Sequence, residues 1–90
     1  MSAVWIPQVL RSSVGGEKQV ELDGATVREL VDGLVGRFPA LRSQLLTTEG
    51  DLNRFVNVYV NGQDVRYLDG LDTPVAARDE VRLLPAMAGG

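Results

Sequence analysis

Alternating apolar and polar residues predict several β-strands in this chain. Residues 4–10 and 18–22 both follow the alternation, and Gly15-Gly16 between them signals a turn. The two runs therefore predict a hairpin. Pro7 has no N–H to donate, so the first strand either lies at a sheet edge or stops pairing at this residue.

The clearest strand signal lies in the second half of the chain. In the run 55–60, one side carries three valines and the other carries Phe55, Asn57 and Tyr59. Asn61-Gly62 follows directly and favours a type I′ hairpin, from which residues 63–67 return as a short strand. Residues 81–85 predict the last strand, with Val81 and Leu83 inward and Arg82 and Leu84 outward.

A helical pattern separates the two groups of strands. Its apolar positions form one stripe at helical spacing: Val27, Leu30, Val31, Leu34, Val35 and Phe38. Thr26 and Glu29 make a capping box that starts the helix, and Pro39 ends or redirects it. A short second helix is predicted over residues 40–46, followed by a polar loop over 47–53.

The order of elements predicts an α+β fold. A helix between two hairpins must pack on one face of the sheet that they share. The simplest solution is the β-grasp arrangement, a mixed four- to five-stranded sheet packed on one main helix, with the first and last strands parallel at its centre. We expect a single domain over residues 1–85 and a flexible diglycine tail over 86–90.

Composition excludes several classes of function. The chain has no cysteine and no histidine, which excludes a thiol nucleophile, a Cys/His zinc site and a hydrolase built on a Ser-His pair. The acidic residues lack the spacing of a calcium loop, so no metal site is predicted. A net charge of -3 disfavours nucleic acid as a partner. Neither a membrane span nor a secretory signal is predicted, so the expected location is the cytoplasm.

The chain ends with two glycines, which are the candidate reactive site. Glycine has no Cβ, so Gly89-Gly90 is a thin and pliable end that can enter a narrow active site of another protein. The Gly90 carboxylate is the candidate reacting group, and Gly89, Ala88 and Met87 supply clearance around it. A carboxylate activated by a partner needs no catalytic residue in its own chain, so we expect a protein substrate and not an enzyme.

A candidate docking surface follows from strand alternation. If the first, last and central strands adjoin, the outward side chains form one patch of Trp5, Tyr59, Arg82 and Leu84. Tryptophan, tyrosine and arginine are enriched at binding hot spots. Arg54, Arg66 and Arg78 are candidate neighbours of the base of the tail, but solvated surface charge is the favoured interpretation of these three residues.

These features together resemble the MoaD/ThiS family of ubiquitin-like sulfur carriers over nearly the whole chain. Three runs are similar to the members that serve cysteine synthesis: residues 6–11, residues 54–61 with 64–66, and residues 84–90. The resemblance implies that an E1-like enzyme uses ATP to adenylate Gly90 and that a sulfur donor then forms a thiocarboxylate. The carrier itself would bind no cofactor. A cysteine synthase-like enzyme would accept the sulfur, and a metalloprotease would release the product.

Other interpretations of the same residues remain open. Within the family, the chain is also compatible with the small subunit of molybdopterin synthase, which works with a large subunit, or with a carrier that supplies a thiosugar synthase. A second class is a ubiquitin-like modifier joined through Gly90 to lysines of target proteins. A third class is an interaction module whose diglycine end has no role.

The composition of the tail predicts its dynamics in the free protein. Small residues and glycines offer little apolar area to offset the entropy of ordering. We expect low backbone order parameters on the ps–ns timescale from Met87 onward, measured by NMR relaxation. Values typical of a rigid backbone in the monomer would contradict this expectation.

Overall fold

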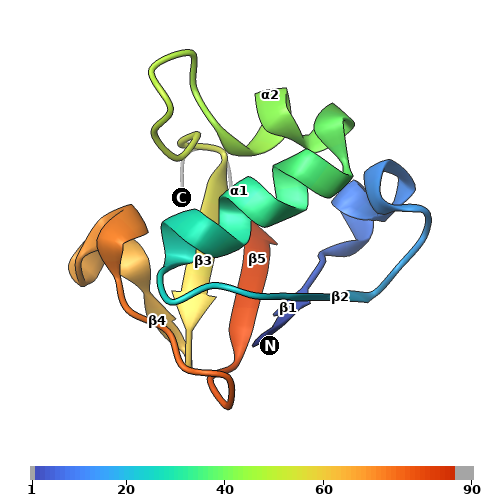
Figure 1. Ribbon diagram of the computed structural model, residues 1–90. Coiled ribbons are helices and arrows are strands. Elements are labelled where there is room, and N and C mark those ends of the chain that lie inside the picture. The colour runs from blue at the N-terminus through green and yellow to red at the C-terminus, as the bar shows by residue number, and fades with distance from the viewer. Residues whose placement is uncertain (1, 87–90) are drawn as a thin grey trace.

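The computed structural model describes residues 2–86 and forms one five-stranded mixed sheet, shown in Figure 1 with its main helix lying across it. The sheet order is β2-β1-β5-β3-β4. The strands are β1 (Ser2–Trp5), β2 (Gln19–Leu22), β3 (Val56–Val60), β4 (Gln63–Asp64) and β5 (Val81–Pro85). β1 and β5 run parallel, and the other neighbours are antiparallel. The predicted β-grasp fold is confirmed, with the first and last strands paired inside the sheet.

The helices lie between the two hairpins. The main helix is α1 (Val27–Arg37), followed by the 3-10 turn η2 (Pro39–Leu41) and the short helix α2 (Arg42–Leu45). The capping box is confirmed, because Thr26 Oγ1 accepts a hydrogen bond from the Glu29 N–H at 3.3 Å and Glu29 Oε1 accepts one from the Ala25 N–H at 3.0 Å. Phe38 is the C-terminal cap of α1, so the helix ends one residue earlier than the apolar stripe.

The core lies between α1 and one face of the sheet. The predicted stripe of α1 is buried except for Phe38, which is half-buried at its edge. It packs over the inward side chains of the sheet: Val4, Val20, Leu22, Val56, Val58, Val60, Val81 and Leu83. One helix can cover only one face, so the opposite face of the sheet stays in contact with solvent.

Two predicted strands are shorter in the structure. The first stops at Trp5, and residues Gln8–Val14 form the 3-10 helix η1, which begins after Pro7. The prediction of a strand through residue 10 is therefore wrong, because Pro7 ends the pairing. The strand predicted over 63–67 keeps only β4 and continues as the 3-10 turn η3 (Val65–Tyr67), since the Asp64 side chain accepts a hydrogen bond from the Arg66 N–H. A further 3-10 turn, η4 (Gly70–Asp72), lies in the segment that precedes β5.

The turns at the end of the sheet opposite Pro85 are held by Asn61. Asn61 and Gly62 both have positive φ, as the predicted type I′ hairpin requires. The Asn61 side chain donates to Asp79 Oδ1 at 3.0 Å and accepts from the Glu80 N–H at 2.9 Å. A hydrogen bond from the Ala76 N–H and the one from Asn61 lower the pKa of the Asp79 carboxyl. Within residues 2–86, no helix is long and apolar enough to cross a membrane.

The buried stripe of α1 predicts a large stability effect for one side chain. Leu34→Ala removes a side chain that is 1% exposed, and we expect it to lower the free energy of unfolding by about 2–5 kcal/mol. Thr26→Ala should cost about 1 kcal/mol through the lost cap. Urea denaturation followed by circular dichroism measures both. Asp32→Ala, on the exposed side of α1, is the control and should change stability by less than about 0.5 kcal/mol.

Candidate functional site

The face of the sheet opposite α1 carries the four residues of the predicted docking patch. β1, β5 and β3 lie side by side, so Trp5 is level with Arg82 across one pair of strands and Tyr59 is level with Arg82 across the other. Leu84 lies further along β5, opposite Asn57. We call Trp5, Tyr59, Arg82 and Leu84 the outer patch. The strand register that the sequence suggested is therefore present, and Arg82 lies between two aromatic side chains.

Arg82 is fixed over Trp5 by two contacts. Its guanidinium carbon lies 5.1 Å from the centroid of the Trp5 ring, and its Nε donates to Glu80 Oε1 at 2.8 Å. The hydrogen bond with Arg82 lowers the pKa of the Glu80 carboxyl and raises the pKa of Arg82. Both side chains remain about half exposed, so the ion pair adds little stability and mainly orients the guanidinium.

A shallow groove continues from the outer patch to the end of β5. We call it the outer groove, and it is lined by Arg54, Asn57, Tyr59, Asp64, Arg66, Tyr67, Leu84, Pro85 and Ala86. Tyr67 is 88% exposed and stands at its rim. The groove therefore combines apolar and aromatic walls with two arginines at the point where the described chain ends.

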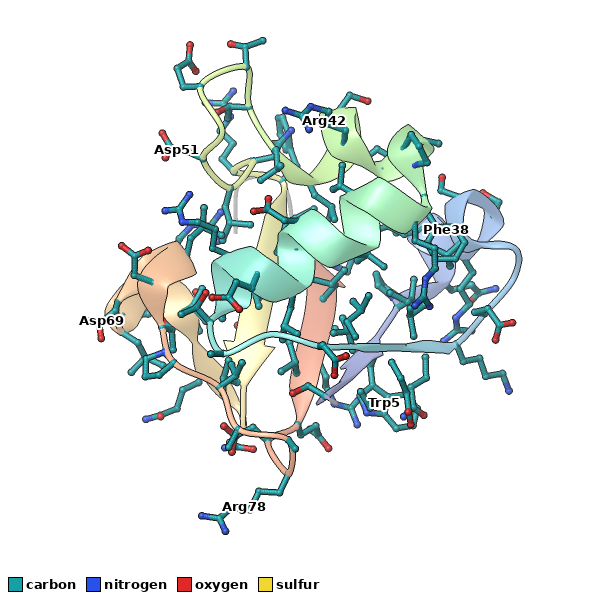
Figure 2. All side chains as sticks on the ribbon, viewed as in Figure 1. Trp5, Phe38, Arg42, Asp51, Asp69 and Arg78 are labelled. Atoms are coloured by element: carbon teal, nitrogen blue, oxygen red, sulfur yellow. The ribbon has the colours of Figure 1, made fainter. Side chains whose placement is uncertain are left out.

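The three arginines that the sequence suggested as neighbours of the tail lie in different places, and only Arg54 and Arg66 line the groove at the end of β5. Arg66 donates to Asn57 Oδ1 at 2.5 Å, to the Val56 carbonyl at 2.9 Å and to the Asn53 carbonyl at 3.0 Å. Arg66 is exposed, as expected for a solvated charge, and its guanidinium is in addition held by two backbone carbonyls, one just before β3 and one at its first residue. The Arg54 guanidinium lies over the Phe55 ring at 5.1 Å. Arg78 is exposed in the loop that leads into β5, at the end of that strand opposite Pro85, as Figure 2 shows.

A second groove lies on the other side of Pro85. We call it the side groove, and it is lined by Val9, Leu10, Gln44, Asn53, Phe55, Val56 and Pro85. Sequence alternation placed Phe55 on the same side as Tyr59, but its side chain lines this second groove and not the outer one. The reason is local: Asn53 Oδ1 accepts a hydrogen bond from the Phe55 N–H at 3.0 Å, so residues 53–55 form a turn and the alternation starts only at Val56.

The side groove was missed by sequence reasoning. The predicted strand includes Val9, whereas the structure places Val9 on the 3-10 helix η1, where it is 67% exposed next to the start of β3. Pro7, which starts this 3-10 helix, was the available signal. Phe55 is 57% exposed, as its position on the side opposite the buried valines predicts, but its place in a groove beside η1 is not predicted by alternation.

The predicted reactive residues lie outside the part of the chain that the structure describes. Met87, Ala88, Gly89 and Gly90 follow the last described residue, Ala86. The Ala86 N–H donates to the Phe55 carbonyl at 2.9 Å, so pairing with the chain that precedes β3 continues one residue past β5. In residues 2–86, no three His, Cys, Asp or Glu side chains come together in a group that could hold a metal ion.

Comparisons with known proteins agree on one family. The model of the ThiS family matches residues 4–90. The sulfur carrier protein CysO of Mycobacterium tuberculosis is 42% identical over 89 residues, which cover 97% of this chain and 96% of CysO. The structure of the Amycolatopsis orientalis BexX/CysO complex contains a chain that matches with a TM-score of 0.90 and 46% identity, with 100% of both chains covered. Small archaeal modifier protein 1 of Haloferax volcanii is 40% identical over 73 residues, 80% of this chain and 79% of that protein.

Proposed function

Because the chain belongs to the ThiS family of ubiquitin-like sulfur carriers, we propose that Gly90 carries sulfur as a thiocarboxylate. The observation that carries this proposal is the family match, which extends through Gly89 and Gly90 to residue 90. The α-carboxyl has an ordinary pKa of about 3.3–3.7, so it is ionised at neutral pH and can act as a nucleophile.

The proposed reaction has two displacement steps, the first at the α-phosphate of ATP and the second at the carbonyl carbon of Gly90. A carboxylate oxygen of Gly90 attacks the α-phosphate of ATP, and pyrophosphate leaves to give an acyl-adenylate. Hydrosulfide then attacks the carbonyl carbon, the C–O bond to AMP breaks, and loss of the proton from sulfur leaves the thiocarboxylate. ATP is the co-substrate of an E1-like activating enzyme, and the carrier is a protein co-substrate that works with it in the cytoplasm.

We propose cysteine biosynthesis as the pathway. Full-length similarity to CysO supports a cysteine synthase-like acceptor, with a metalloprotease that releases cysteine from the tail. The Amycolatopsis orientalis structure contains a related carrier in complex with BexX, which supports binding of the carrier to a partner protein. A molybdopterin synthase large subunit or a thiosugar synthase is the alternative acceptor.

A second function is favoured by one specific comparison. Small archaeal modifier protein 1 is similar over four-fifths of the chain, which supports conjugation of Gly90 to amines of other proteins. Lys18 is the single lysine of this sequence, so a conjugate between two copies through a side chain would have to use it. Mass spectrometry of digested cell extracts distinguishes the two functions, because a modifier leaves isopeptide-linked tail remnants on target lysines.

Activation of Gly90 is directly measurable. The protein, ATP, its activating enzyme and a sulfide source should yield an intact mass in which one oxygen is replaced by sulfur. Deletion of Gly90 should abolish the change and leave the circular dichroism spectrum unaltered. An unchanged mass with an enzyme of demonstrated activity would exclude the proposed function.

The outer patch should bind the activating enzyme. A tail of a few residues buries little area, and interfaces under about 1,000 Å² are usually transient, so a second contact is needed. Trp5→Ala and Tyr59→Ala should each raise the apparent KM for the carrier by a factor equivalent to about 1 kcal/mol or more, with kcat retained. Adenylation kinetics with folded variants provide the measurement. If both variants keep the parent KM, the enzyme docks elsewhere.

A further inference from the structure

The exposed apolar side chains of this protein gather around the base of the tail. Among the described residues, the large hydrophobic side chains that remain exposed are Val9, Phe55, Tyr67, Leu68 and Leu84. Val9 and Phe55 line the side groove, and Tyr67 and Leu84 line the outer groove. Leu68 lines neither. Pro85 belongs to both grooves, so apolar surface surrounds the point from which the tail leaves the domain.

The length of the tail limits how far a partner can stay from this surface. Gly90 is the fourth residue after Ala86, and an extended chain spans at most about 3.6 Å per residue, so Gly90 reaches at most roughly 14 Å from Ala86. A pocket that encloses the tail has walls on all its sides. Those walls must therefore approach the domain on both sides of Pro85, over the side groove as well as over the outer patch.

The side groove has an apolar surface, and the polar side chains that line it already make hydrogen bonds within the protein. Gln44 donates to Ser13 Oγ and to the Ala40 carbonyl, and Asn53 bonds both the Ser43 carbonyl and the Phe55 N–H. These bonds leave Val9 and Phe55 as the exposed contact surface, with Leu10, which belongs to the core, lining the groove between η1 and β3. An apolar surface of this kind, rimmed by polar groups, is typical of a binding site.

Charge next to the groove adds a second element of recognition. The Arg54 guanidinium lies over the Phe55 ring and also lines the outer groove, so one cation lies between the two surfaces. A partner carboxylate placed there would complement it. The described geometry thus fits an apolar side chain flanked by an acidic one.

We propose that the side groove is a docking site for the enzyme that acts on Gly90, separate from the outer patch, and that it receives an apolar side chain of that enzyme beside the entrance to its tail pocket. This inference rests on the proposed function, because it requires an enzyme that binds the tail. It assigns Val9 and Phe55 to binding and leaves the chemistry to Gly90.

The test compares exposed residues that differ in position. Val9→Ser and Phe55→Ser should raise the apparent KM for the carrier about fivefold or more and leave kcat unchanged, measured with an activating enzyme that adenylates the parent. Leu68→Ser is the matched control and should keep the parent KM. Val9→Ile retains the apolar contact and should also keep it. Circular dichroism and thermal unfolding verify that each variant is folded.

The outcomes separate this inference from the function on which it rests. Failure of the parent to gain sulfur would overturn the proposed function. A parent that reacts, together with Val9→Ser and Phe55→Ser variants of unchanged KM, would overturn only the side groove. A further outcome is a dimer of the parent, detected by sedimentation and lost in both variants while their KM is unchanged. This outcome would assign the groove to a second copy of the chain and likewise overturn the proposal.

Discussion

The parallel pairing of β1 with β5 is the constraint on which the rest of this structure depends. It joins the first and last strands at the inside of the sheet, with Val4 opposite Val81 and Trp5 opposite Arg82. Val4 and Val81 then face α1 and become part of the core, whereas Trp5 and Arg82 face solvent on the other side. One register therefore fixes both the buried face and the face that is available to partners.

The same pairing places the end of the described chain away from the core. β5 ends at Pro85, where the two grooves meet, and Ala86 extends the pairing by one hydrogen bond to the Phe55 carbonyl. Substitutions around this exit can alter recognition without disturbing the buried stripe of α1. We therefore expect stability and partner choice to depend on different residues in this domain.

Local signals in the sequence were sufficient for most of the fold. The valines of β3, the Asn61-Gly62 turn and the Thr26 cap act over a few residues, and each is present as predicted. The remaining features depend on proline positions and on side-chain hydrogen bonds in turns. Pro7 ended β1 early, the Asp64 side chain turned the chain into η3, and the turn at Asn53 placed Phe55 in the side groove and not beside Tyr59. The outer patch followed from alternation, while the side groove is formed by residues of η1 and of the start of β3, which lie far apart in the sequence, so Pro7 signals η1 but not the groove.

The central position of β5 has a mechanical consequence. β5 lies between β1 and β3 and bonds to both. A pull on the chain beyond Pro85 acts along the strand, and the ladder hydrogen bonds lie across that direction, so they share the load in shear and do not open one after another. Under the proposed function, an enzyme could therefore draw the tail taut into a narrow pocket while β5 remains in the sheet.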